Sequence, residues 1–476
     1  MYDVIIIGCG VIGAATAYAL SKTNCSVLVL EAENDVASGT TKANSAILHA
    51  GFDPEPGTMM ARLNVRGVAL AKEICQKLDV PYRQCGSLVV ATTESEMGVL
   101  KELLERGIQN GVPGLEILTG EKLRHKEPNL SKNTIAALWA PTAAIVSPWE
   151  YALAMAECSV MNGAVLKRNA RVIGITRRED HWEVHTKEES FCGQFVINAA
   201  GIASETIHNM VATSSFHITP TRGQYYILDK NEGNRVSSVV FPCPTKEGKG
   251  VLVAPTVHGN CIVGPSAEPV QGDDTSNTSM GLISVAAAAR RIVPEVDLRA
   301  SIRNFAGVRA NSDRGDFIIE FAAPGFLDLA GIKSPGLSAA AAIGEEAVRM
   351  LKEQGLYVEY NSHFVSHRRR VRFKELTAEE KNALIQENPQ YGRVICRCET
   401  ITEGEILDCL HTPIPPVSVD GVKRRCNAGM GRCQGGFCGP RILEILSREL
   451  GVSPTKIPQE HNGSNIILQM TKQEDR

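Results

Sequence analysis

The stretch YDVIIIGCGVIGAATAYAL, residues 2–20, decides the fold. Its first six residues form an apolar run that predicts a buried strand, and the alanine-rich segment after the glycines predicts a helix. A second apolar run, SVLVLEAE, follows and predicts a strand that ends at Glu31. A strand, a glycine turn, a helix and a second strand within about 30 residues predict a β-α-β unit.

Three glycines in this unit, Gly8, Gly10 and Gly13, have the spacing of a dinucleotide-binding turn. The first glycine permits a tight turn, the second lets backbone amides approach a pyrophosphate, and the third lets helix and strand pack closely. The helix N-terminus favours phosphate charge, and Glu31 can accept hydrogen bonds from ribose hydroxyls. The motif therefore predicts a bound dinucleotide, without choosing between FAD and NAD.

The composition is that of an ordinary globular protein. The 476 residues carry 50 Lys and Arg against 53 Asp and Glu, a net charge of −3, which excludes collagen-like, disordered and polyanion-coating classes. The apolar opening has Asp3 and no basic residue before it, and no other apolar stretch is long enough to span a bilayer. We therefore expect a cytoplasmic chain without a transmembrane segment, with peripheral association at the inner face of the membrane as an open alternative.

The rest of the chain alternates between helical and strand-rich segments. Residues 54–148 are charged and predict helices, residues 149–161 predict a further helix, and residues 217–264 contain several strand-like runs. The basic run HRRRVRFK, residues 367–374, predicts a solvated or interdomain surface rather than a nucleic-acid site, because only one aromatic residue interrupts it. From about residue 394 the chain becomes rich in cysteine.

Several separated motifs occur in the order ASGTTKANSAILHAGFDPEPGT (residues 37–58), FVINAAGIAS, GVRANSDRGDFIIE and IKSPGLSAAAAIG. They resemble the D-amino-acid-oxidase-type flavoproteins, within which the similarity is to bacterial glycerol-3-phosphate dehydrogenases and oxidases and to L-2-hydroxyglutarate oxidases. The resemblance covers about residues 1–355. It implies an α/β fold, in which a Rossmann-like FAD-binding domain is interleaved with an α+β substrate domain.

This resemblance divides the chain into parts. We expect FAD-binding parts at about 1–53, 141–215 and 300–355, substrate-domain parts at about 54–140 and 216–299, a linker at 356–392, a small helical cysteine-cluster domain at 393–450 and a tail at 451–476.

The same resemblance implies which residues contact FAD. Thr41, Asn44 and Ser45 would lie along the pyrophosphate and the flavin, and Val172 would support the adenine end. Two glycines would lie close to the cofactor, namely Gly201 and Gly331. The helix that starts near Ser338 would point its positive end at the flavin, which favours the anionic reduced form.

Oxidation of a secondary alcohol by a flavin needs a base for the hydroxyl proton and cations for an anionic substrate. His49 is the candidate base, because a neutral imidazole accepts a proton near pH 7. Arg309 is the first candidate for binding a phosphate or carboxylate. Lys249 is the second, and Arg222 is comparable to it.

Each of these residues also has a structural alternative. His49 could be a hydrogen-bonded histidine of a buried loop, and Lys249 a solvated turn residue. Arg309 could form an ion pair with Asp313 or Asp316.

Six of the 14 cysteines fall between Cys396 and Cys438. Two pairs, Cys396-x-Cys398 and Cys433-x-x-x-x-Cys438, supply four thiolates, which in principle bind a [2Fe-2S] cluster or zinc. The segment 394–445 resembles the bacterioferritin-associated-ferredoxin-like [2Fe-2S] domain, which implies the iron-sulfur cluster. Of the two other cysteines, Cys426 could replace a ligand and Cys409 is expected in the core.

Together these features predict a reaction. The resemblance implies oxidation of sn-glycerol 3-phosphate to dihydroxyacetone phosphate by FAD, with L-2-hydroxyglutarate or another 2-hydroxy or amino acid as the rival substrate. A one-electron cluster on the same chain favours transfer to an electron-accepting flavoprotein or quinone-linked subunit over direct oxidation by oxygen. A different class of function, an electron-relay subunit that no longer oxidises substrate, stays open.

Overall fold

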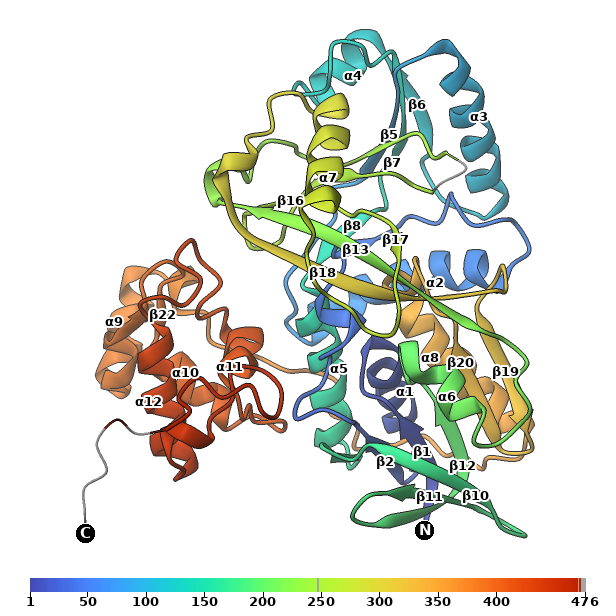
Figure 1. Cartoon of the computed structure of the whole chain (residues 1–476), viewed down its shortest axis with the longest axis vertical. Coiled ribbons are helices and arrows are strands. Elements are labelled where there is room, and N and C mark those ends of the chain that lie inside the picture. Colours follow the sequence, from blue (N-terminus) through green and yellow to red (C-terminus); the bar gives the residue numbers. More distant parts are fainter. Residues whose placement is uncertain (246–247, 470, 472–476) are drawn as a thin grey trace.

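The opening strand β1 (Tyr2–Ile7) lies inside an eight-stranded sheet of the computed structural model, which describes residues 1–245, 248–469 and 471 (Figure 1). β1 pairs in parallel with β2 (Val27–Leu30) on one side and with β12 (Ser190–Asn198) on the other. Parallel strands are covered on both faces, so an unbroken apolar run is needed. The predicted β-α-β unit is confirmed.

The first sheet has the strand order β10-β11-β12-β1-β2-β9, and β20 extends it from β12. Beside it, helix α1 packs against both α5 and α8. The predicted helix at 149–161 is confirmed as α5. The bounds of these elements are α1 (Val11–Ser21), α5 (Pro148–Met161), β9 (Val165–Lys167), β10 (Val172–Arg177), β11 (Trp182–Thr186), β19 (Ile318–Ala323), β20 (Phe326–Ala330) and α8 (Gly336–Glu353).

A second sheet of nine strands is formed largely by the segments predicted as the substrate domain, in the order β17-β13-β16-β15-β14-β5-β7-β6 with β18 on β13. Its strands are β5 (Ser87–Ala91), β6 (Glu116–Thr119), β7 (Ala136–Ala140), β13 (Ile218–Leu228), β14 (Val239–Pro242), β15 (Leu252–Pro255), β16 (Cys261–Gly264), β17 (Glu268–Pro269) and β18 (Ser301–Ser312). The strands expected in 217–264 are therefore present.

The prediction that residues 54–148 are helical is wrong in part. The segment does contain α2 (Met59–Lys77), α3 (Glu94–Gln109) and α4 (Gly120–Lys126), but it also supplies β5, β6 and β7 to the second sheet. These strands are four or five residues long. Apolar runs this short have no readable period, so only their pairing in the folded sheet identifies them.

We expected the third FAD-binding part to begin near residue 300, but the chain returns to the first sheet later than this. β18 pairs with β13 along its whole length in the second sheet, and only β19 and β20 belong to the first. A third sheet of three strands has the order β3-β8-β4, with β3 (Ile47–Leu48), β8 (Ala144–Val146) and β4 (Tyr82–Arg83). Helix α6 (Ser204–His208) packs on the first sheet and α7 (Ser279–Ile292) on the second.

The C-terminal part is a small helical domain beside the other two (Figure 1). Its elements are α9 (Ala378–Glu387), β21 (Val394–Cys396), β22 (Ile401–Thr402), α10 (Glu403–Leu410), α11 (Val419–Cys426) and α12 (Gly439–Leu450). The expected helical character is confirmed. Across the described residues, none of the helices has the length and apolarity needed to cross a bilayer.

The basic run at 367–374 lies between domains, which is one of the two locations predicted for it. Arg368 is 7% exposed and pairs with Glu157 of α5 at 2.6 Å, and Arg370 pairs with Glu150 of α5 at 3.0 Å. These ion pairs connect the segment that leads into the C-terminal domain with the first domain.

A second set of buried charges joins α11 to the loop after β2. Asp35 is 1% exposed and accepts hydrogen bonds from Arg424 and Arg425 of α11, each at 2.8–2.9 Å. The guanidinium of Arg425, then that of Arg424, holds the pKa of Asp35 well below its usual range, against the effect of burial. Glu460 of the tail pairs with Arg424 and with Lys42, so the tail contacts the first domain. Residues 470 and 472–476 of that tail lie outside the described residues.

We predict that Asp35→Asn destabilises the protein by about 3 to 5 kcal/mol, because it leaves two buried guanidiniums without their carboxylate. Since folding lowers the pKa of Asp35, its stabilisation is present above the unfolded pKa, near 3.9, and is lost as the pH falls below that value. Calorimetric unfolding at neutral pH measures the change.

The control is Glu33→Gln, whose ion pair with Arg171 is exposed and contributes about 0 to 1 kcal/mol. An unchanged midpoint for Asp35→Asn would contradict the prediction.

Candidate functional site

The glycine turn between β1 and α1 is closely packed. A Cβ at Gly13 would lie 1.9 Å from the carbonyl oxygen of Gly8, and a Cβ at Gly8 would lie 2.6 Å from the carbonyl oxygen of Ala199. Gly8 also has a φ of +98°, which disfavours any residue with a side chain. Gly10 faces the hydroxyl of Thr41, which accepts a hydrogen bond from the Val11 amide at 2.9 Å. The turn thus leaves backbone amides without side chains over them.

Glu31 follows β2 directly and is 8% exposed. Its carboxylate accepts hydrogen bonds from the backbone amides of Cys9 at 2.8 Å and Glu33 at 2.9 Å. Burial raises the pKa of Glu31 to about 7, although both hydrogen bonds act in the opposite direction. The Ala170 amide donates to the Glu31 carbonyl, so the chain entering β10 at Val172 runs beside this carboxylate.

The loop that contains Thr41, Asn44 and Ser45 is held by its own side chains. The Asn44 amide group donates to the Thr41 carbonyl and accepts from the Ala46 amide, both at 2.7 Å. The Ser45 hydroxyl is 3.2 Å from the hydroxyl of Tyr225 on β13. This loop therefore connects the first sheet with the second, where the two would enclose a cofactor.

Two further predicted positions flank this region. Gly201 follows β12 with a φ of +60° and has no atom within 4 Å of a Cβ placed on it, whereas a Cβ on Gly331 would meet the Ser312 hydroxyl at 2.8 Å. Ser338 lies fully buried in the first turn of α8, and its hydroxyl accepts a hydrogen bond from the His49 amide at 2.7 Å. The N-terminus of α8 is thereby attached to the strand end that carries His49.

His49 lies beside an ion pair. Lys249 contacts Asp53 at 2.7 Å, and both charges act on the imidazole, whose Nε2 is 3.4 Å from the Ser334 hydroxyl. Burial, and to a smaller extent the positive charge of Lys249, lower the pKa of His49 to about 3, while Asp53 acts in the opposite direction. The imidazole is therefore neutral at pH 7 and able to accept a proton. Lys249 is paired with Asp53 rather than free.

Arg309 on β18 is half-buried and, among the described residues, forms no ion pair. Its guanidinium lies over Gly223, where a Cβ would come within 2.5 Å of Nη2, and it donates to the Ser266 carbonyl at 3.5 Å. The alternative partners of Arg309 are used elsewhere. Asp313 accepts from the His217 amide, and Asp316 accepts from two amides at the start of α2.

Arg222, the comparable cation, is 6% exposed and pairs with Glu268 at 3.0 Å and Asp274 at 2.8 Å. Both of these partners are carboxylates, so the positive charge of Arg222 is already balanced. Arg309 is thus the predicted cation that remains available for an anionic substrate.

The structure gathers the four predicted cysteine ligands as two pairs. The sulfur atoms of Cys398 and Cys433 are 3.6 Å apart, and the thiols of Cys396 and Cys438 form a hydrogen bond with each other. Within the described part of the chain, no three metal-binding side chains converge in the manner of a single-ion site. The two pairs together supply four thiols, the number that a [2Fe-2S] cluster takes. Cys426 is hydrogen-bonded to Cys409 instead.

Sequence reasoning missed several residues of this region. Tyr225 stacks on Phe305 with ring centroids 4.7 Å apart, and Phe241 of β14 lies 5.6 Å from the His49 ring. Asp53, next to Lys249, was also missed. All of these residues except Asp53 lie on strands of the second sheet. In the sequence they are aromatic residues within strand-like runs, a pattern that is equally typical of residues in a hydrophobic core, so it did not mark them as site residues.

Both parts of the chain match known protein families. Residues 3–350 match the sequence model of the FAD dependent oxidoreductase family, and residues 394–448 match that of the BFD-like [2Fe-2S] binding domain. The chain belongs to the FAD dependent oxidoreductases. Its cofactors are FAD and a [2Fe-2S] cluster, and the side-chain-free turn at Gly8 and Gly13 and the two thiol pairs fit these groups.

Three relatives show how far the similarity extends. A glycerol 3-phosphate dehydrogenase of Caloramator mitchellensis is 48% identical and is covered, like this chain, over 100% of its length. A human mitochondrial L-2-hydroxyglutarate dehydrogenase is 30% identical over 67% of this chain and 80% of its own. The structure of L-alpha-glycerophosphate oxidase from Mycoplasma pneumoniae with FAD bound is 31% identical, with a TM-score of 0.72, over 77% of this chain and 98% of its own.

We predict that Gly13→Ala yields protein without bound FAD, because the new Cβ would force α1 away from β1 at the turn. Absorbance of the purified protein in the visible range measures flavin content. Gly98→Ala is the matched control, since Gly98 lies exposed in α3 with no atom within 4 Å of an added Cβ, and it should retain full flavin content. Normal flavin in Gly13→Ala would show that the turn tolerates a side chain.

We also predict that Cys398→Ser loses the iron-sulfur absorption and iron content while keeping FAD. Cys398 is exposed, so the substitution removes a thiolate without creating a buried cavity. Cys426→Ser is the matched control and should keep its cluster, because Cys426 contacts Cys409 rather than the four grouped thiols. Loss of the cluster in the control variant would place Cys426 among the ligands.

Proposed function

We propose that this protein is a dehydrogenase that oxidises sn-glycerol 3-phosphate to dihydroxyacetone phosphate with FAD, and that its [2Fe-2S] cluster passes the electrons to a partner protein. The observation that carries the proposal is the match to a glycerol 3-phosphate dehydrogenase over both domains and the full length of each chain. When bound, FAD would supply a hydride acceptor for C2 of the substrate, and the cluster would supply a one-electron carrier.

The residues around His49 suit the proton transfer. A neutral imidazole takes the C2 hydroxyl proton, and the low pKa of His49 keeps it neutral at the pH of the cell. Burial is the main cause of this low pKa, and the Lys249 charge adds to it. His49 is thus proposed as the base, and Lys249, paired with Asp53, as the charged neighbour that keeps it neutral.

Arg309 is proposed to bind the phosphate. Its guanidinium presents parallel N–H donors that match a phosphate, and no carboxylate among the described residues neutralises it. β18 also contacts the loop of Thr41, since the Thr40 hydroxyl donates to the Val308 carbonyl at 2.6 Å. Arg309 is therefore next in sequence to a residue that touches the cofactor loop.

The C-terminal domain favours a dehydrogenase over an oxidase. The glycerophosphate oxidase structure is covered over 98% of its own chain by only 77% of this one, so it has no counterpart of the cluster domain. In this protein the cluster loops contact the second sheet directly. Lys230 pairs with Glu399 at 2.8 Å, and Arg303 donates to Gln434 at 3.1 Å. This contact supports a route for electrons away from FAD, through the cluster, to a flavoprotein or quinone-linked partner.

An anaerobic titration of the purified protein tests the proposed function. Addition of sn-glycerol 3-phosphate should bleach the flavin band and then the iron-sulfur absorption, while L-2-hydroxyglutarate should bleach neither. The protein should also reduce an artificial acceptor faster than it produces hydrogen peroxide in air. Bleaching by L-2-hydroxyglutarate alone would favour the second substrate, and no bleaching by either would favour the electron-relay function.

We predict that Arg309→Ala raises KM for glycerol 3-phosphate by about 10- to 100-fold, corresponding to the loss of about 1.5 to 3 kcal/mol from a charged hydrogen bond. Steady-state kinetics with an artificial acceptor measures the change. The matched control is Arg222→Ala, which removes a buried guanidinium already paired with two carboxylates and should lower stability rather than raise KM. An unchanged KM in Arg309→Ala would remove Arg309 from the substrate site.

A further inference from the structure

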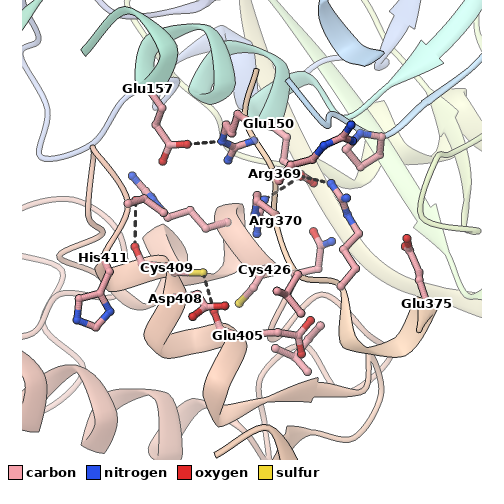
Figure 2. A pocket seen from close by; sticks show the side chains of 18 of the residues that line it. Glu150, Glu157, Arg369, Arg370, Glu375, Glu405, Asp408, Cys409, His411 and Cys426 are labelled. Atoms are coloured by element: carbon pink, nitrogen blue, oxygen red, sulfur yellow. Dashed lines mark hydrogen bonds and ion pairs between the residues drawn. The ribbon is translucent and has the colours of Figure 1, made fainter. Parts of the chain in front are cut away.

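A cavity of about 950 Å³ lies where the C-terminal domain meets the other two (Figure 2). One wall is α5 of the first domain, and a second is the basic segment that contains Arg368 and Arg370. The third wall is formed by the ends of α10 and α11. The cavity is separate from the region around His49, none of whose residues lines it.

Two cysteines of the C-terminal wall face each other across the helix contact. Cys409 belongs to the last turn of α10 and Cys426 ends α11, and these two helices pack together. Both residues line the cavity, and their thiols interact with each other; Cys409 Sγ also donates to the Glu405 carbonyl at 3.1 Å and Cys426 Sγ to the Val422 carbonyl at 3.4 Å. They are 3% and 7% exposed, and neither belongs to the two thiol pairs assigned to the cluster. Figure 2 shows both sulfur atoms on the side of the cavity formed by the C-terminal domain.

Charged groups of both signs surround the pair, and Arg370, Arg425 and Glu157 act on Cys409. The hydrogen bond from Cys426 lowers the pKa of Cys409, burial opposes this, and the guanidiniums of Arg370 and Arg425 lower it further. The same hydrogen bond and burial raise the pKa of Cys426. Cys409 is thus the thiol more readily converted to a thiolate, which is the nucleophilic form of cysteine. Cys426, which stays protonated, is placed to react second.

We propose that Cys409 and Cys426 form a redox-responsive thiol pair, which hydrogen peroxide entering the cavity oxidises to a disulfide. The Cys409 thiolate attacks one peroxide oxygen, the O–O bond breaks, and the departing hydroxide takes a proton to become water, leaving a sulfenic acid. The sulfur of Cys426 then attacks the sulfenic sulfur, the S–O bond breaks, and the leaving hydroxide takes the Cys426 proton as water. Two electrons pass from the two sulfurs to the peroxide.

The bond would form at the joint between domains. Arg425, next to Cys426 in the chain, is the residue whose guanidinium holds Asp35 in the loop after β2. Linking Cys426 to Cys409 would therefore restrain the end of α11 that carries this contact. A cross-link also restricts the unfolded chain between the two cysteines, so the oxidised C-terminal domain should unfold at a higher temperature than the reduced one.

Peptide mapping of the full-length protein, with both cofactors bound, tests the proposal. The protein is treated with increasing hydrogen peroxide, then unfolded in the presence of iodoacetamide and digested. We expect a peptide pair linked through Cys409 and Cys426, with the loss of two alkylatable thiols per chain, at peroxide concentrations that leave the flavin and iron-sulfur absorption unchanged. Dithiothreitol should restore both thiols.

Cysteine variants test which of the two thiols reacts with peroxide first. In Cys426→Ala the sulfenic acid of Cys409 has no partner, so dimedone should label Cys409; in Cys409→Ala, dimedone should not label Cys426. Cys192→Ala is the control, because Cys192 is a half-buried cysteine of β12 that does not line the cavity, and this variant should still form the linked peptide. Labelling of Cys426 in Cys409→Ala would overturn the assigned order.

The proposal is overturned if Cys409 and Cys426 are still recovered as alkylated thiols once the cluster absorption has begun to fall. It is also overturned if the linked peptide forms only after the protein has been unfolded. These outcomes are independent of the proposed function, because neither depends on which substrate reduces the flavin.

Discussion

The close contact between α1 and β1 at Gly13 is the constraint on which the flavin site depends. Because Gly13 lies against the carbonyl of Gly8 with no room for a Cβ, α1 starts at the end of β1 and directs its first amides at the turn. β2 then brings Glu31 back to the same edge, where its carboxylate accepts from the Cys9 amide. In a parallel sheet, the ends of neighbouring strands meet at one edge, so this packing contact brings the glycine turn and Glu31 together where the pyrophosphate and a ribose of a dinucleotide would bind.

The second sheet carries the candidate phosphate-binding residue and the residues that contact the cluster loops. The paired strands β13 and β18 extend from the cofactor loop, where Tyr225 contacts Ser45, to the C-terminal domain, where Arg303 contacts Gln434. One pair of strands thus carries the candidate phosphate-binding residue Arg309, encloses the flavin side and supports the cluster loops. This arrangement explains how chemistry on FAD and transfer through a cluster can be combined in a single chain.

Buried charge holds the C-terminal domain in place. Asp35 with Arg425, and Glu157 with Arg368, are nearly fully removed from water, so each group depends on its partner. Such pairs contribute little net free energy compared with apolar packing, but the loss of one partner is costly. They therefore favour one relative position of the domains over others. The cavity that Cys409 and Cys426 line is the space that this charged junction leaves unfilled.

The sequence alone determined the features that depend on residues close together in the chain. These are β1, α1, the glycine turn and the two cysteine pairs, because local spacing and hydrophobic period encode them. Only the tertiary structure decided that Arg309 has no carboxylate partner among the described residues, that Lys249 pairs with Asp53, and that Cys426 contacts Cys409. It also placed the short strands between residues 54 and 148 in the second sheet. Such partnerships join residues far apart in sequence, and burial and strand pairing, which select them, exist only once the chain is folded.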